Sequence, residues 1–275
     1  MVHVETCYRH PDRLTGTHCT RCGRPVCPEC MVAAPVGHHC PTCVSEDNKG
    51  VRQVSWRPGS TQLGGRITPM VKLLVGINVV IFLLTSQHLD NDILRFGQLP
   101  IRVAHGQYYR LLTSAFLHVS FVHILFNMVA LLIVGSPVEA ALGRVRFLTL
   151  YILAALGGSV ASYLFSNPLA VGVGASGAIF GIFGAFFIIA RSRRSDTSGI
   201  LVLIGINLVF SFTDRLIDWR AHVGGLIVGV VVGAIFTLAD RRPPNQKRLV
   251  EVVGCTAVLL ALLALTSFRT HNLTG

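Results

Sequence analysis

The sequence predicts an all-α membrane protein that crosses the bilayer several times and carries a small cysteine-rich module ahead of its membrane part. Hydrophobic residues make up 51% of the 275 positions and charged residues only 13%, about half of what soluble domains carry. The apolar residues form runs that are longer and more continuous than the core helices of soluble domains require. Seven of the eight cysteines lie before residue 45, which sets that segment apart from the rest.

Seven apolar runs are candidate membrane-spanning helices when judged against the roughly 20 residues that one crossing needs. The fifth run has only about 14 residues, so its crossing depends on more than hydropathy. In order, the runs cover residues 69–85, 116–135, 147–165, 175–190, 199–212, 221–238 and 249–267. We therefore predict a seven-helix membrane domain over residues 69–267.

The charge distribution predicts how these helices are oriented. The first fifty residues lack the apolar stretch of a signal peptide, so we expect a cytosolic amino terminus. The inside loops of the seven-helix arrangement then carry most of the arginines, as the positive-inside rule requires. We expect an integral protein of a bacterial plasma membrane with its carboxyl terminus outside. The net charge of +11 is thereby attributed to topology, and no nucleic-acid partner is expected.

The amino-terminal module, residues 1–44, contains four closely spaced pairs of metal ligands, enough for two tetrahedral structural zinc sites. A flexible basic linker over residues 45–68 is expected to follow it. In a cross-brace the first and third pairs share one ion and the second and fourth pairs the other. In the alternative, sequential pairing, neighbouring pairs share an ion. His38 and His39 lie near the last pair and are candidates to replace one of its ligands. The pairs are Cys7 with His10, Cys19 with Cys22, Cys27 with Cys30, and Cys40 with Cys43. This spacing resembles that of B-box-type zinc fingers.

Two polar residues in the glycine-rich apolar runs indicate chemistry within the membrane. Ser176 lies at the start of the fourth run and His222 at the start of the sixth. The bilayer penalises buried polar side chains unless they find a partner, so a Ser-His catalytic pair is the leading hypothesis. The two residues share a depth only if the short fifth run crosses. Small residues spaced four apart in both runs favour a close approach of the two helices.

The second helix adds polar residues whose role is open at this level. His123 and Asn127 are spaced i, i+4 and so project from one face. They can donate hydrogen bonds to an oxyanion in acyl transfer, or they can hold the bundle together through interhelical hydrogen bonds. Neither the fourth nor the sixth run contains an acidic residue, so we expect a dyad without a third member.

Five motifs follow one another along the membrane part: Tyr109-Arg110 through His118, His123 through Asn127, Glu139 before Leu142-Gly143, Gly174-Ala175-Ser176-Gly177, and Ala221-His222-Val223-Gly224-Gly225 with Gly229. In this order they resemble the rhomboid family of intramembrane serine proteases. Tyr109 stands directly before Arg110, where the family usually has a tryptophan. The resemblance implies a rhomboid-like six-helix core over residues 69–238 with an extra helix at 249–267.

The resemblance also implies roles for individual residues. Ser176 becomes the nucleophile and His222 the general base, while His123, Asn127 and the Ser176 amide become oxyanion donors. Phe180 would pack on the histidine. Arg110 and Glu139 would be structural, the first in the long loop after helix one and the second in the region after helix two.

The expected function is hydrolysis of peptide bonds in or near the transmembrane segments of membrane proteins, with no cofactor for catalysis. The expected partners are those transmembrane substrates, the lipid bilayer and a cytosolic protein bound by the finger. One alternative is a non-catalytic membrane protein that binds transmembrane clients with the same bundle. Another is a metal-responsive transporter or sensor, against which the absence of visible inverted repeats counts.

Overall fold

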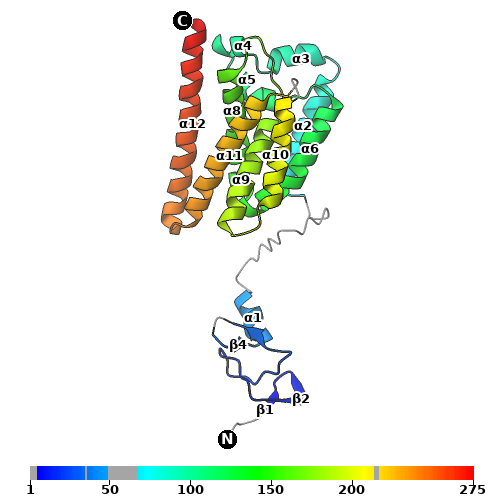
Figure 1. Cartoon of the computed structure of the whole chain (residues 1–275), viewed down its shortest axis with the longest axis vertical. Helices are drawn as coiled ribbons and strands as arrows, with labels where there is room; N and C mark the ends of the chain where they lie inside the picture. Colours follow the sequence, from blue (N-terminus) through cyan, green and yellow to red (C-terminus); the bar gives the residue numbers. More distant parts are fainter. Residues whose placement is uncertain (1–4, 35, 49–66, 214–216) are drawn as a thin grey trace. The chain divides into compact units, whose positions relative to one another are not determined.

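The computed structural model describes residues 5–34, 36–48, 67–213 and 217–275, which fall into two compact units (Figure 1). The units are Met1–Trp56 and Arg57–Gly275, and each is described by itself. Most of the predicted linker, residues 49–66, lies outside the described residues. The last described residues before it belong to helix α1 (Pro41–Asn48), so regular structure continues past the predicted boundary at residue 44.

The first unit is built around cysteines rather than around an apolar core. Strands β1 (Glu5–Cys7) and β2 (His10–Thr15) pair antiparallel, as do β3 (Val32–Ala33) and β4 (His38–His39). Six cysteines are buried in its core, and Val26 is the one other buried hydrophobic residue described there. A unit this small cannot bury enough apolar area to fold alone, so it needs an additional source of stability such as bound metal.

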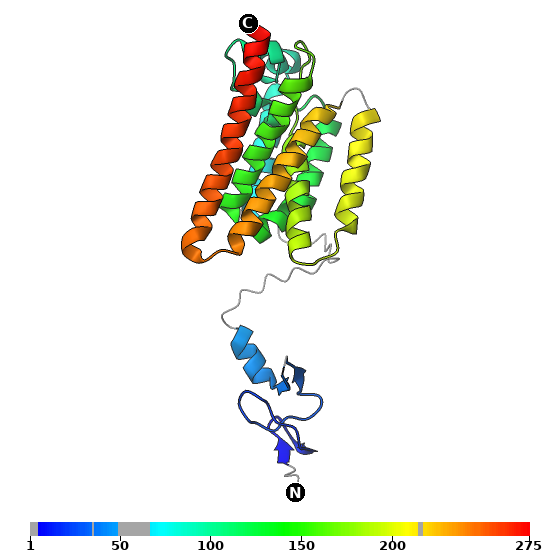
Figure 2. The same cartoon turned by 60° about the vertical axis from the view of Figure 1, so that its left-hand side comes forward.

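The second unit is an all-α bundle whose seven apolar helices correspond to the seven predicted runs (Figures 1 and 2). Four of them are both long and apolar enough to cross a membrane, and α2, α9 and α10 are shorter. The predicted fold class, an all-α polytopic membrane protein, is confirmed. The helices are α2 (Pro69–Thr85), α6 (Phe121–Ala130) continued by a π-helical turn (Leu131–Gly135) and α7 (Ser136–Leu142), α8 (Arg144–Phe165), α9 (Ser176–Ser192), α10 (Ser198–Thr213), α11 (Trp219–Asp240) and α12 (Pro244–Thr274).

The second helix begins later than its hydropathy predicts. The hydropathy predicts that residues 116–120 belong to the helix. Phe116 instead ends a 3-10 turn (Ser114–Phe116), and the residues after it lead to the helix cap Ser120. The Ser120 side chain accepts a hydrogen bond from the backbone N–H of His123 at 3.2 Å. A serine cap of this kind ends the extended chain and starts the helix, which is why the apolar residues before it remain outside.

The loop between α2 and α6 is ordered and contains short helices. It contains α3 (Leu89–Phe96), α4 (Pro100–Ala104) and α5 (Arg110–Thr113). The buried Arg110 guanidinium donates to the carbonyl of Gly97 at 2.7 Å and to Oε1 of Gln107 at 2.7 Å. The arginine therefore satisfies a backbone carbonyl that the irregular chain leaves open.

Glu139 acts on the first helix of the bundle rather than on the region after the second. Its two carboxylate oxygens accept hydrogen bonds from the backbone N–H groups of Met70 at 3.0 Å and Val71 at 2.9 Å. These are among the first N–H groups of α2, which have no partner within the helix. A carboxylate at this position also complements the positive end of the helix dipole.

Helices α9 and α11 pack closely through the glycines that the sequence singles out. A side-chain carbon added at Gly225 would collide with the backbone of Gly177, and one added at Gly229 would collide with that of Gly181. The prediction of close approach is confirmed. Two glycine-lined helices that touch in this way bring the beginnings of α9 and α11 side by side, where Ser176 and His222 lie.

Candidate active site

Ser176 is placed by a sharp turn at the beginning of α9. Gly174 has φ +130°, a conformation that side-chain-bearing residues rarely adopt, and its N–H donates to the carbonyl of Ser114 at 2.9 Å. A Cβ at this position would lie 2.9 Å from Nε2 of His123. Ser176 follows as the first residue of the helix, so its backbone N–H is one of the donors without an intrahelical partner.

Ser176 and His222 meet across the interface of α9 and α11. The Nε2 atom of His222 lies 2.7 Å from Oγ of Ser176, and His222 is buried in the first turn of α11. This distance allows the hydroxyl to pass its proton to the imidazole. Because both residues lie at the beginnings of their helices, α10 must return the chain to the same end of the bundle, as the dyad hypothesis requires.

The imidazole of His222 is held from two further directions. Phe180, one turn along α9 from Ser176, stacks on it with ring centroids 4.2 Å apart and planes inclined by 13°, as the sequence resemblance implies. On the edge opposite Ser176, Nδ1 of His222 lies 2.6 Å from Oγ of Ser211 in α10. The histidine is thus bonded through both of its ring nitrogens.

Sequence reasoning does not identify Ser211, because the third member of a catalytic triad is usually acidic. A weak signal was present: Asn207 and Ser211 are spaced i, i+4 in an otherwise apolar run, and polar groups at such a depth need a partner. Nothing in that spacing names His222 as the partner, so the contact required the fold.

His123 and Asn127 lie on one face of α6, and the ring of His123 lies beside the turn at Gly174 that precedes Ser176. The Nδ2 group of Asn127 donates to the carbonyl of His123 at 2.9 Å, which leaves the second N–H of the amide for another acceptor. Nδ1 of His123 is buried without a hydrogen-bond partner among the described residues. Its ring also meets that of His118 edge-on at 5.0 Å. The structure thus brings the ring of His123 next to Gly174, two residues before Ser176, and Asn127 is hydrogen-bonded to the backbone of His123.

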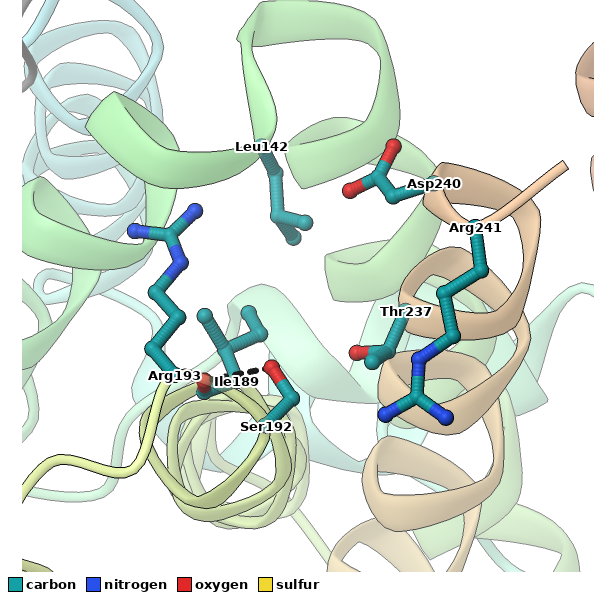
Figure 3. A pocket seen from close by; sticks show the side chains of 7 residues that line it. All are labelled: Leu142, Ile189, Ser192, Arg193, Thr237, Asp240 and Arg241. Atoms are coloured by element: carbon teal, nitrogen blue, oxygen red, sulfur yellow. Dashed lines mark hydrogen bonds between the residues drawn. The ribbon is translucent and has the colours of Figure 1, made fainter. Parts of the chain in front are cut away.

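A cavity of about 220 Å³ lies at the opposite ends of α9 and α11, away from the Ser-His pair (Figure 3). Ile189 and Ser192 line it from α9 and Thr237 and Asp240 from α11, together with Arg193 and Arg241, which directly follow these helices, and Leu142 of α7. It contains neither member of the pair.

The ligand pairs of the amino-terminal module form two clusters of four. One comprises Cys7, His10, Cys27 and Cys30, and the other Cys19, Cys22, Cys40 and Cys43, with the donor atoms of each within 4.8 Å of one another. Two sulfurs bound to tetrahedral zinc are separated by roughly 3.8 Å, and the sulfurs of Cys22 and Cys40 are 3.7 Å apart. Alternate pairs share a cluster, which is the cross-brace rather than the sequential arrangement, and the donors fit zinc.

The cysteines of each cluster divide by pKa: burial raises the pKa of Cys30 to about 11 and that of Cys43 to about 12, while the pKa values of Cys7 and Cys19 are lowered. Burial alone raises the pKa of the Cys7 thiol, yet hydrogen bonds from backbone N–H groups, first that of Arg9, outweigh burial and bring the pKa to about 6. The pKa of Cys19 is likewise brought to about 6 against burial, first by the N–H of Cys22. A thiolate is the form that binds metal.

Comparisons with known proteins identify the family to which this membrane-spanning bundle belongs. Residues 105–239 match the Rhomboid domain. The chain is 42% identical to Rhomboid protease GluP of Bacillus subtilis over 58% of this chain and 32% of that protein. It is 31% identical to Putative rhomboid protease YdcA of Bacillus subtilis over 61% of this chain and 88% of that protein. Rhomboid protease AarA of Providencia stuartii is 25% identical over 76% of this chain and 86% of that protein.

The chain belongs to the rhomboid family. It spans about a third of the length of GluP but most of the length of YdcA and AarA. The domain match begins at residue 105, so it covers the candidate active site and does not extend to the cysteine-rich module.

Proposed function

We propose that this protein is an intramembrane serine endopeptidase that hydrolyses peptide bonds in or near transmembrane segments of membrane proteins. The observation that carries the proposal is the 2.7 Å contact between Ser176 Oγ and His222 Nε2. Relatives named as rhomboid proteases support the assignment of the chemistry. No cofactor is needed for this reaction, since both proton transfer and bond formation are carried out by side chains.

The reaction follows from the atoms in contact. The Ser176 hydroxyl gives its proton to Nε2 of His222 while Oγ attacks the scissile carbonyl carbon, which forms a tetrahedral intermediate. His222 then protonates the departing amine, the C–N bond breaks, and an acyl-serine ester remains. A water molecule that loses its proton to the same nitrogen attacks the ester and frees the carboxylate and the serine.

The negative oxygen of the tetrahedral intermediate needs donors close to Ser176. The N–H at the beginning of α9 is suited to this role because helix N-termini carry free donors and partial positive charge. In the proposal, His123 and the second N–H of Asn127 add side-chain donors from α6. Loss of one such donor costs other enzymes roughly 3–4 kcal/mol of transition-state stabilisation.

The orientation of the bundle follows in the proposal from its arginines. Arg193 and Arg194 follow the end of α9, and Arg241 and Arg242 follow the end of α11. The positive-inside rule places this end toward the cytosol. Ser176 and His222 then lie toward the outer surface, the amino terminus is cytosolic and the carboxyl terminus, after α12, is outside.

The cysteine-rich module is proposed to bind two structural zinc ions, one in each cluster of four donors. Such closed sites leave no coordination position for a substrate, so the ions serve folding and the module serves binding. In the proposal, the module binds a cytosolic protein partner. We assign no part of the peptide hydrolysis to it, since its residues contribute nothing to the contact between Ser176 and His222.

The decisive variant is Ser176→Ala in the purified full chain. Cleavage of a reporter membrane protein should fall to background while the thermal transition of the protein is retained. Ser192→Ala is the matched control, because Ser192 is an exposed residue at the other end of the same helix and its hydroxyl donates to the carbonyl of Ile189. Undiminished cleavage by Ser176→Ala overturns the proposal, and client binding without cleavage by the unmodified protein favours the non-catalytic alternative.

A further inference from the structure

The second nitrogen of His222 determines whether the first can act as a base. Neutral imidazole carries one proton, and only the nitrogen without it can accept the proton of Ser176. The contact of Nε2 with Ser176 is therefore productive when the imidazole proton resides on Nδ1. In many hydrolases a carboxylate holds the proton there, and no carboxylate of the described residues is hydrogen-bonded to His222.

The hydrogen bonds around Ser211 define where that proton lies. Its Oγ lies 2.6 Å from the carbonyl oxygen of Asn207 and 2.6 Å from Nδ1 of His222. A carbonyl oxygen can only accept, so the single hydroxyl proton of Ser211 is directed to Asn207. Both contacts are then hydrogen bonds only if Nδ1–H of His222 donates to Ser211 Oγ. This leaves the lone pair of Nε2 facing the hydroxyl of Ser176.

We propose that Ser211 is the positioning residue of the active site, a neutral acceptor that holds His222 in its base-competent tautomer. The inference rests on the proposed function and deepens it. When Nε2 takes the proton of Ser176 the ring becomes a cation, and Ser211 Oγ, polarised by the Asn207 carbonyl, remains bonded to its Nδ1–H. No ionised carboxylate has to be kept within the bundle, where burying a charge is costly.

The environment of Ser211 distinguishes it from an ordinary helix serine. Serine and threonine hydroxyls in helices commonly bond the carbonyl four residues earlier without further consequence. Thr213, on the same helix, does this with Val209 at 3.1 Å and is exposed. Ser211 is 2% exposed, and along α10 it shares burial only with Ile200. The end of α10 near the active site is thus joined to the bundle by the residue that contacts His222.

In this arrangement the position of α10 affects which tautomer His222 adopts. Helix α10 stands at the edge of the bundle (Figure 2), and most of its side chains are exposed or half-buried. A displacement of its final turn would remove the acceptor from Nδ1 and leave the histidine free to adopt the other tautomer. In the proposal, His222 is competent when α10 is seated against α11.

The test compares Ser211→Ala, Ser211→Thr and the control Thr213→Ala in the full chain. Three quantities are measured: kcat and KM for a reporter membrane protein, and the rate at which a small fluorophosphonate labels Ser176, which reports serine reactivity directly. We expect Ser211→Ala to lower kcat and the labelling rate about 5- to 150-fold, the equivalent of one buried donor left without its partner. KM should change little. Ser211→Thr retains the hydroxyl and should recover most of both rates, and Thr213→Ala should match the unmodified protein.

A double-mutant cycle tests whether Ser211 and His222 are energetically coupled, as the positioning role requires. The melting temperatures of Ser211→Ala, His222→Ala and the double variant are compared, because residues in contact give non-additive effects. Ser211→Ala should shift the melting temperature less in the His222→Ala background. Fully additive shifts, or a Ser211→Ala protein with unchanged kcat and labelling, would overturn the positioning role. If Ser176→Ala still cleaves, the proposed function itself fails, which is a different result.

Discussion

The aromatic ring of Phe180 lies nearly parallel to the imidazole of His222, with centroids 4.2 Å apart. The two rings come from different helices, so their stacking ties the orientation of the imidazole to the packing of α9 on α11. Phe180 itself is 3% exposed and has no freedom to turn away. The histidine is therefore fixed by a face contact with Phe180 and by edge contacts at its two nitrogens.

Replacing Phe180 should slow the reaction, beyond its effect on the stability of the fold. We expect Phe180→Ala to lower kcat while KM stays nearly constant, because the imidazole loses the surface that keeps it aimed at Ser176. Truncation of a buried phenylalanine also costs about 3–5 kcal/mol, so Phe180→Tyr, which keeps the ring, serves as the second variant. Activity near that of the unmodified protein in Phe180→Ala would contradict this role of the stacking.

Glycines at the crossing of α9 and α11 should be intolerant of any side chain. Gly229→Ala is expected to lower the stability of the membrane unit by about 1–3 kcal/mol, since the added carbon meets the backbone of Gly181 in a core that cannot expand freely. Gly205→Ala in α10 is the control, because open space surrounds that position. Thermal unfolding in detergent measures both, and equal transitions for the two variants would refute the close packing.

The cap that Glu139 provides for α2 predicts a specific loss of stability. Glu139→Gln retains the shape of the side chain but removes its charge and turns one acceptor into a donor that cannot bond the N–H of Met70 or Val71. We expect a loss of about 1–3 kcal/mol, typical of a buried donor left unsatisfied. Asp90→Asn, an exposed acid in the first turn of α3, should alter the transition far less. A larger effect of the Asp90 change would argue against the cap.

Metal content provides an independent prediction for the amino-terminal module. Elemental analysis of the purified chain should find two zinc ions per protein. Cys27→Ser and Cys40→Ser should each lose one ion, because each removes a ligand from a different cluster. Cys255→Ser, a change in α12 outside both clusters, should keep two. One ion in the unmodified protein, or loss of both ions by a single ligand change, would disprove two separate sites.

Deletion of residues 1–44 should leave intrinsic proteolysis largely intact. The reason is that every contact described for Ser176 and His222 is made within the membrane unit. Cleavage of a reporter membrane protein by the shortened chain measures this, with its thermal transition as the check on folding. Complete loss of cleavage in a folded protein would show that the module takes part in the activity.

The sequence predicts this fold well where one local signal is enough. The seven apolar runs, the glycines of α9 and α11 and the cysteine spacing each report a property of neighbouring residues. The start of α6 was misplaced because Phe116 and Leu117 are apolar and Ser120, which begins the helix, is a cap that hydropathy does not register. The target of Glu139 was likewise hidden, because its partners precede it by 68 and 69 positions.

The candidate site shows the same division. Ser176 and His222 can be identified from the sequence as polar residues in glycine-rich apolar runs. The structure adds the distance between them. Ser211 carries no such mark, because a hydroxyl within a helix most often bonds its own backbone. Its contact with His222 arises only when α10 lies beside α11, a tertiary arrangement that no spacing within the run encodes.

The central claim is that His222 activates the hydroxyl of Ser176 as a nucleophile. Its most direct test is treatment of the full chain with a fluorophosphonate, followed by mass spectrometry that locates the adduct and measures its rate of formation. The account predicts a single adduct on Ser176 that forms at least tenfold more slowly in His222→Ala, in line with the contribution of general base catalysis. An adduct on another residue, or equal labelling of Ser176 without the histidine, would contradict it.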